Sequence, residues 1–134
     1  MVVIKISEFS EELGRRMKQK AIAIDFDGVI HRFSKGWQDG SIYDPPIDGT
    51  KEALEKLATK GYRIVIHTTR FNHEINGKKT PQLIKELKKW LSRNGFEKGK
   101  HYHKITELKP QAVAYIDDKA IRFTHWQDVI KHFA

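Results

Sequence analysis

Short apolar runs alternate with longer amphipathic stretches along this chain, and this alternation is the feature that most constrains its fold. The runs at 21–26, 62–66 and 112–116 are rich in isoleucine, valine and alanine without strict polar alternation, which is typical of strands covered on both faces. The stretches at 49–60 and 81–94 repeat their apolar residues with the helical period. Strands that alternate with helices predict an α/β fold with a mostly parallel sheet.

Four further elements are expected, namely a helix over 8–19, strands over 103–106 and 120–123, and a helix over 126–133. Together they predict a three-layer, Rossmann-like α/β architecture around a central, mostly parallel five-stranded sheet. Because no linker, repeat or low-complexity tract interrupts the 134 residues, we expect a single domain over 1–134.

Composition limits the possible chemistry. The chain has no cysteine, which excludes disulfides and thiolate sites, so a bound metal must use oxygen or imidazole ligands. No apolar stretch approaches the ~18 residues of a membrane span, and the first ten residues carry too much charge for a secretory signal. We therefore expect a cytoplasmic protein without a membrane partner.

Positive charge is concentrated in one part of the chain. The net charge is +8, and residues 78–100 hold eight basic side chains against two acidic ones. Such a segment is either a solvated helix face or a surface that attracts phosphate-bearing partners, nucleic acid among them.

Reactive side chains follow each strong strand. They are Asp25 and Asp27 after the first run, Thr68, Thr69 and Arg70 after the second, and Asp117 and Asp118 after the third, with Lys109 shortly before the third run. Because parallel strands end at the same edge of a sheet, we expect these groups to converge on one rim. Two carboxylates at about 4 Å repel each other by about 4 kcal/mol at an effective dielectric constant of about 20. A divalent cation, with Mg2+ as the hard cation that suits oxygen ligands, is therefore expected among them.

Four segments of the sequence resemble, in order and in structural context, the four motifs of the haloacid dehalogenase-like hydrolases. They are Ile22-Ala23-Ile24-Asp25-Phe26-Asp27-Gly28-Val29-Ile30, Ile64-Val65-Ile66-His67-Thr68-Thr69-Arg70, Lys109-Pro110 and Tyr115-Ile116-Asp117-Asp118. The resemblance spans residues 21–118. It implies a Mg2+-dependent phosphomonoesterase that works through an aspartyl-phosphate. The gaps between motifs are too short for a separate cap domain, so the chain resembles a small capless member.

The resemblance implies a role for each motif residue. Asp25 would be the nucleophile and a metal ligand, and Asp27 would be the general acid and base that also binds metal through its backbone carbonyl. Thr68 would hydrogen-bond the transferred phosphoryl group. Lys109 would offset the charge of nucleophile and phosphate. Asp117 would bind Mg2+.

Alternatives stay open at several of these positions. Asp118 would ligate the metal directly or through water, or would have a structural role instead. Thr69 competes with Thr68, and Arg70 either binds a substrate phosphate or forms an exposed salt bridge. Three other lysines compete with Lys109, namely Lys85, Lys88 and Lys104.

Histidines and one tryptophan add further candidates. His31, His67 and His73 lie near the expected rim, where they can contact substrate. His101 and His103 form either a metal-binding pair or a solvent-facing pair. Residues 29–33 and 41–43 are expected to pair as a short flap hairpin. Its tip carries Trp37, which either stacks on a base or another flat group or packs on its own loop.

Two other classes of function remain. A metal-dependent nuclease also uses carboxylate clusters beside positive surfaces, and a non-catalytic phosphate or nucleic-acid binding module would keep the fold without the chemistry. For the phosphatase, the candidate substrates are nucleotides, sugar phosphates and phosphorylated nucleic-acid ends.

Overall fold

The computed structural model describes residues 19–72 and 77–134 of the chain. The helix expected over 8–19 lies outside these ranges except for its last residue, and so does His73. None of the described helices is long and apolar enough to cross a membrane.

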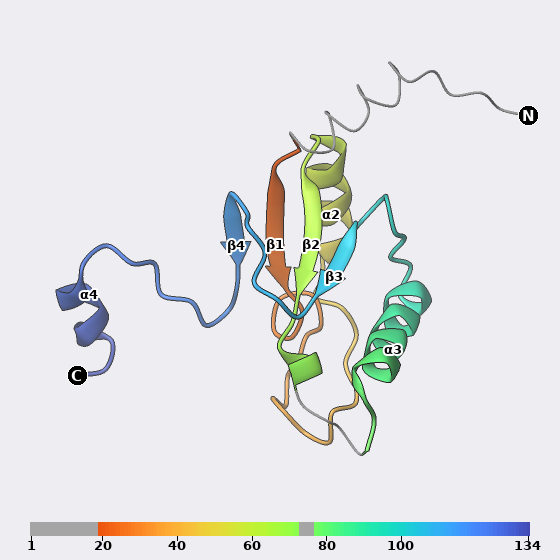
Figure 1. Cartoon of the computed structure of the whole chain (residues 1–134), viewed down its shortest axis with the longest axis horizontal. Coiled ribbons are helices and arrows are strands. Elements are labelled where there is room, and N and C mark those ends of the chain that lie inside the picture. Colours follow the sequence, from red (N-terminus) through yellow and green to blue (C-terminus); the bar gives the residue numbers. More distant parts are fainter. Residues whose placement is uncertain (1–18, 73–76) are drawn as a thin grey trace, which may run out of the picture.

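Four parallel strands form the sheet within the described ranges (Figure 1). They are β1 (Ala21–Asp25), β2 (Arg63–His67), β3 (Lys104–Thr106) and β4 (Ala114–Ile116), in the order β3-β2-β1-β4. Asp25 is level with His67 on β2, and Ile24 is level with Ile116 on β4. The chain therefore leaves β1, β2 and β4 at the same edge, and the predicted α/β class with a parallel sheet is confirmed.

The predicted fifth strand over 120–123 is wrong, because these residues form no strand. The two large apolar side chains of this run, Ile121 and Phe123, are both exposed. In Figure 1 the chain moves away from the edge of the sheet after β4 and ends in the short helix α4 (Trp126–Lys131). Without a neighbouring strand to supply hydrogen bonds, so short a run does not stay extended in a sheet.

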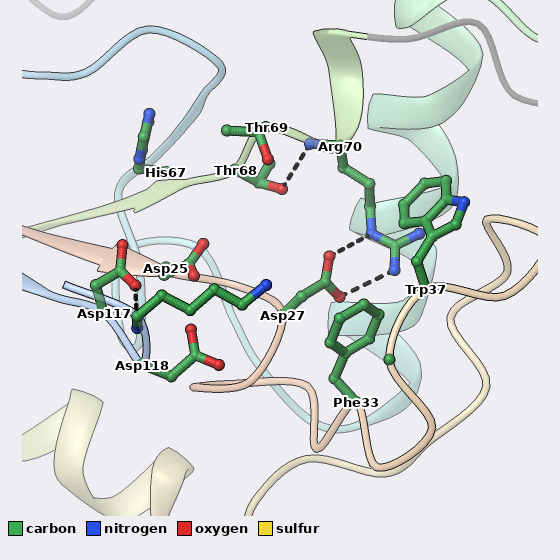
Figure 2. A pocket seen from close by; sticks show the side chains of 12 residues that line it. Asp25, Asp27, Phe33, Trp37, His67, Thr68, Thr69, Arg70, Asp117 and Asp118 are labelled. Atoms are coloured by element: carbon green, nitrogen blue, oxygen red, sulfur yellow. Dashed lines mark hydrogen bonds and ion pairs between the residues drawn. The ribbon is translucent and has the colours of Figure 1, made fainter. Parts of the chain in front are cut away.

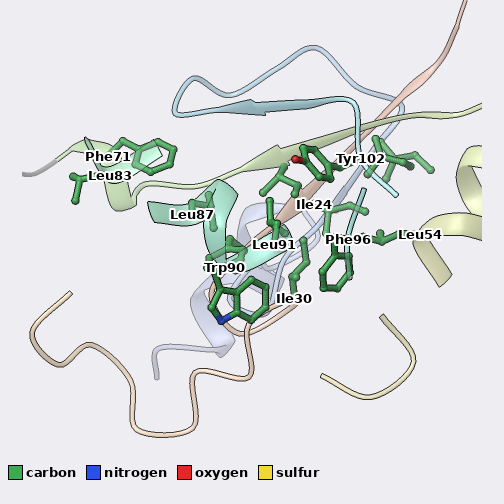
Figure 3. Close-up of a cluster of buried hydrophobic side chains, with 14 residues drawn as sticks. Ile24, Ile30, Leu54, Phe71, Leu83, Leu87, Trp90, Leu91, Phe96 and Tyr102 are labelled. Atoms are coloured by element: carbon green, nitrogen blue, oxygen red, sulfur yellow. The ribbon is translucent and has the colours of Figure 1, made fainter. Parts of the chain in front are cut away.

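The hydrophobic core lies on one face of β1 and β2. Ile22, Ile24, Ile64 and Ile66 point into it from the sheet. The helices α2 (Thr50–Thr59) and α3 (Thr80–Arg93) add their apolar faces, which on α3 comprise Leu83, Leu87, Trp90 and Leu91 (Figure 3). Each fully buried side chain of this size contributes about 1.5–3 kcal/mol.

The opposite face of the two central strands is buried as well. Ala23 and Val65 point away from the core cluster, since successive side chains alternate along a strand, yet they are only 2% and 3% exposed. The interpretation of β1 and β2 as strands covered on both faces is therefore confirmed. Two rigid central strands hold the residues that follow them.

The loop after β1 differs from the predicted hairpin. Residues 30–32 pair with 45–47 instead of 41–43: the Ile47 N–H donates to the Ile30 carbonyl at 2.9 Å and the Arg32 N–H to the Pro45 carbonyl at 3.1 Å. The side chain of Tyr43 explains the difference, because its hydroxyl donates to the Gly36 carbonyl at 2.7 Å and so holds the loop tip. We call residues 32–44 the flap.

Candidate active site

A cavity of about 610 Å³ opens at the carboxyl edge of the sheet, within the range of roughly 300–1,000 Å³ of small-molecule sites (Figure 2). Seven of the eight reactive residues that the sequence associates with the strong strands line it: Asp25, Asp27, Thr68, Thr69, Arg70, Asp117 and Asp118. The flap adds Phe33, Gly36 and Trp37, and His67 and Lys119 complete the lining. The expected convergence of strand ends is thus present for all of these eight residues except Lys109.

Three carboxylates gather at one end of this cavity. Asp25, Asp117 and Asp118 offer oxygen atoms that all lie within 4.8 Å of one another. Burial, followed by the negative charge of Asp117, raises the pKa of Asp25 from 3.8 to about 6. Carboxylate oxygens are the ligands that Mg2+ prefers. An all-oxygen cluster with excess negative charge therefore fits a hard divalent cation.

Gly28 lets Asp118 come close to the loop after β1. Gly28 has a φ of +85°, and a Cβ atom there would lie 2.2 Å from Oδ2 of Asp118. Any side chain at this position would both strain the backbone and displace the carboxylate. The glycine of the Asp-x-Asp-Gly segment is thus a packing requirement of the carboxylate cluster.

Asp27 faces away from this cluster, toward Arg70. The Nε and Nη2 groups of Arg70 donate to the two oxygens of Asp27 at 3.0 and 2.9 Å, and His31 Nδ1 lies 2.8 Å from Oδ1. Burial acts to raise the pKa of Asp27, but the hydrogen bonds from His31 and Arg70 outweigh it and lower that pKa. The two aspartates of the first motif therefore have opposite electrostatic environments.

His31 holds Asp27 from the other side. The imidazole is fully buried, and its Nε2 accepts the Asp44 N–H at 3.0 Å, so the ring proton is on Nδ1 and is donated to Asp27. The ring stacks on Phe26 at a centroid distance of 5.5 Å. Sequence reasoning gave His31 no defined role. The usable signal was its position four residues after Asp27, beyond a glycine turn.

Arg70 is buried, so the alternative of an exposed salt bridge is wrong. Its side chain is 3% exposed, and besides Asp27 it donates from Nη1 to the Gly40 carbonyl at 2.6 Å. Its guanidinium carbon also lies 5.3 Å from the ring centroid of Trp37. Arg70 therefore connects Asp27 to the flap, while its binding of a substrate phosphate stays a prediction.

The two threonines differ in their surroundings. Thr68 is buried and its Oγ1 accepts the Arg70 N–H at 3.1 Å, which leaves the hydroxyl hydrogen for another acceptor. Thr69 is exposed within the cavity lining. Both remain candidates for contact with a phosphoryl group.

Lys109 is the predicted site residue that the structure does not bring into the cavity lining. It is exposed, and its Nζ lies 4.8 Å from the ring centroid of Tyr115. Lys119 lines the cavity instead, and its N–H donates to Asp117 Oδ1 at 2.8 Å. Sequence reasoning overlooked Lys119, although its place directly after the Asp117-Asp118 pair was a usable signal.

The histidine pair near β3 has a structural role. Nδ1 of His101 accepts the Glu97 N–H and Nδ1 of His103 accepts the Ile64 N–H, both at 2.9 Å. His101 is also buried, so the pair is not solvent-facing. Neither residue belongs to a cluster of three potential ligands in the part of the chain that the structure describes.

Comparison with known proteins gives no match to a family model, a curated protein or a solved structure.

Proposed function

We propose that this protein is a small, capless member of the haloacid dehalogenase-like hydrolases, with their three-layer α/β architecture, and that it is a Mg2+-dependent phosphomonoesterase. The observation that carries the proposal is the approach of Asp25, Asp117 and Asp118 to within 4.8 Å, at the edge where the motif-bearing strands end. Thr68 and Asp27 line the same cavity. These groups supply a nucleophile, a metal site, a hydroxyl and a proton carrier for phosphoryl transfer.

Asp25 and Asp117 would hold Mg2+ through their carboxylates, and Asp118 would do so directly or through water. The backbone carbonyl of Asp27 is the remaining protein ligand in this proposal. When bound, Mg2+ offsets the negative charge of the cluster and polarises the phosphoryl oxygens. Few protein ligands suffice, because Mg2+ usually keeps several waters.

In the proposed reaction, a carboxylate oxygen of Asp25 attacks phosphorus and forms an aspartyl-phosphate. The bond between phosphorus and the leaving-group oxygen breaks, and that oxygen takes a proton from Asp27. Asp27 then removes a proton from water, which attacks the aspartyl-phosphate. Inorganic phosphate leaves and the carboxylate of Asp25 is restored.

The contacts of Asp27 affect both of its proposed steps, protonation of the leaving group and activation of water. Its lowered pKa, caused by His31 and Arg70 against the effect of burial, favours the ionised form that acts as a base. To act as an acid, the carboxylate must take up a proton and exchange an Arg70 hydrogen bond for the leaving-group oxygen. His31 and Arg70 are thus positioning residues for Asp27.

A cation for the phosphate oxygens has two candidates. Lys109 is the lysine that the resemblance implies, whereas Lys119 lines the cavity. Comparison of Lys109→Met with Lys119→Met distinguishes them, because loss of the catalytic cation lowers kcat, whereas loss of an exposed lysine elsewhere leaves kcat unchanged.

The test is release of phosphate from p-nitrophenyl phosphate and a panel of phosphate monoesters, with Mg2+ or with a chelator. We expect Mg2+-dependent turnover, loss of turnover in Asp25→Asn, and a decrease of at least ~10²-fold in Asp27→Asn. Asp48→Asn is the matched control, because the Asp48 side chain is fully exposed and its ion pair within the described ranges is a 3.8 Å contact with Arg32.

Trapping of the intermediate makes the test specific. In the presence of Mg2+, beryllium fluoride should bind to Asp25 as a mimic of the aspartyl-phosphate. It should therefore raise the melting temperature of the wild-type protein but not that of Asp25→Asn. Cleavage of oligonucleotides by Asp25→Asn would favour a nuclease instead. A lack of turnover on the whole panel, together with steeply salt-dependent nucleic-acid binding, would favour a binding module.

A further inference from the structure

Two aromatic side chains of the flap line the same cavity as the carboxylates. Figure 2 shows Phe33 and Trp37 on the side away from Asp117 and Asp118, with Asp27 between the two groups. Trp37 is 51% exposed although it forms part of the cavity wall. The cavity therefore has an acidic end and an aromatic end.

Phe33, at the aromatic end of the cavity, has an energetically unfavourable backbone conformation. It is the one non-glycine residue with a positive φ, 56°, in the described ranges, and this region is unfavourable for a bulky side chain. Its ring packs near His31 and Tyr43, with centroid distances of 5.7 and 6.2 Å. Strained residues of this kind are concentrated at functional sites.

The indole ring of Trp37 packs against the guanidinium of Arg70, which is itself held by hydrogen bonds. The guanidinium of Arg70 lies 5.3 Å from the ring centroid, and the Nε, Nη1 and Nη2 groups of Arg70 all donate hydrogen bonds, to Asp27 and to the Gly40 carbonyl. Such a cation-π contact orients the indole. A ring that is supported on one side and half exposed is preorganised to stack with a flat group, at little further entropic cost.

We propose that the aromatic end of the cavity stacks on the base of a nucleoside phosphate while the carboxylate end acts on its phosphate. This inference rests on the proposed phosphatase function and names its substrate class. Asp27 lies between the two ends, so a sugar is needed to join the phosphate to the stacked ring. An aryl phosphate would place its ring beside Asp27, and a simple sugar phosphate would leave Trp37 without a partner.

A nucleoside phosphate can be a free nucleotide or the end of a nucleic-acid strand. A second hollow of about 390 Å³ is bounded by the flap residues Asp39, Gly40, Ser41 and Ile42 and by residues of α3, among which Lys89 and Arg93 are basic and Glu86 is acidic. Lys89 and Arg93 are exposed and have no acidic partner within 4.0 Å among the residues that the structure describes. A strand that leaves the cavity over the flap would meet these cations, so their substitution distinguishes the two sources.

The experiment compares kcat/KM for adenosine 5′-monophosphate and ribose 5-phosphate, which differ only in the base. We expect the wild-type protein to prefer the nucleotide, and Trp37→Leu to lower the ratio of the two values by at least about fivefold, as loss of one base stack does. Trp37→Phe should retain most of the ratio. Trp126→Leu is the matched control, since Trp126 is 70% exposed on α4 and does not line the cavity.

A binding measurement gives a readout that does not depend on turnover. Asp25→Asn is titrated with adenosine 5′-monophosphate while its tryptophan fluorescence is followed. Quenching that disappears in the Asp25→Asn, Trp37→Leu double variant supports the stack, and ribose 5-phosphate should cause no quenching. Lack of turnover of both esters would overturn the phosphatase while this titration still tests the stack.

The stack is overturned if the wild-type ratio is near one, or if Trp37→Leu lowers both kcat/KM values equally. A 5′-phosphorylated oligothymidylate tests whether the nucleoside phosphate is a free nucleotide or the end of a nucleic-acid strand. If Lys89→Gln together with Arg93→Gln weakens only the oligonucleotide reaction and its salt dependence, the substrate is a strand end. If that double variant changes neither the oligonucleotide reaction nor the adenosine 5′-monophosphate reaction, the substrate is a free nucleotide.

Discussion

The substitution Asp25→Asn should stabilise the protein at neutral pH while it removes the proposed nucleophile. Burial and the neighbouring carboxylates raise the pKa of Asp25 from 3.8 to about 6. At about 1.36 kcal/mol per pKa unit, ionisation of this group in the folded protein costs up to about 3 kcal/mol. Asp25 is partly exposed, so solvent screening reduces this to about 1–1.5 kcal/mol.

The sign of the pH dependence follows from the raised pKa. The folded protein holds the proton of Asp25 more tightly than the unfolded chain does, so this group stabilises the fold below about pH 4 and the contribution is lost as pH rises through about 6. Asparagine keeps an oxygen that can accept the Phe26 N–H, at 2.9 Å in the native structure, without the charge. The advantage of the variant should therefore increase across this window.

Urea unfolding with a chelator present, at several pH values between 4 and 7.5, measures this effect. The free energy of unfolding of Asp25→Asn should exceed that of the wild type by about 1–1.5 kcal/mol at pH 7.5 and by much less at pH 4. Asp48→Asn should show no such trend, because that side chain is fully exposed. Added Mg2+ should stabilise the wild type more than the variant. A difference between variant and wild type that stays constant with pH would refute the reasoning.

Two other substitutions test the contacts around the cavity. Gly28→Ala should displace Asp118 and weaken Mg2+ binding about tenfold, measured by thermal shift against Mg2+ concentration, because the new Cβ would lie 2.2 Å from Oδ2. Gly49→Ala has the same backbone strain with nothing within 4 Å, and equal Mg2+ affinities in both variants would contradict the steric argument. Arg70→Gln should lower the free energy of unfolding by about 2–3 kcal/mol at pH 7, because it leaves the partly buried Asp27 carboxylate without its ion pair but with its hydrogen bond from His31. Since the lowered pKa of Asp27 means that this stability is lost as pH falls, urea unfolding at pH 3 should show a smaller loss, and an equal loss at both pH values would exclude this origin.

Elements with a strong local pattern could be predicted from the sequence. The runs that became β1 and β2 bury their isoleucines, and the helical period of α3 buries its apolar face, so the apolar runs and the helical period located these elements to within a residue or two. The rim residues followed, because parallel topology brings the ends of β1, β2 and β4 together. The failed strand at 120–123 had no such pattern and needed a partner that the sequence does not specify.

Contacts between distant residues could not be predicted in the same way. Asp27 and Arg70 are 43 positions apart, and no local sequence pattern pairs them. The pairing of residues 30–32 with 45–47 depends on the hydrogen bond from the Tyr43 hydroxyl to the Gly36 carbonyl, and this bond forms only in the folded loop. The position of Lys109 was uncertain for a similar reason, because the path of the chain between β3 and β4 decides where that lysine lies.

These distant contacts join the two ends of the cavity. Arg70 bonds to Asp27, which is the proposed proton carrier, and also supports Trp37, which is the proposed stacking surface. His31 bonds to Asp27 as well as to the Asp44 N–H at the end of the flap. A displacement of the flap therefore changes the hydrogen bonds of Asp27 through two independent side chains. In the proposed reaction, Arg70 would connect recognition of the leaving group to its protonation, because the leaving-group oxygen and Arg70 would compete for the carboxylate of Asp27.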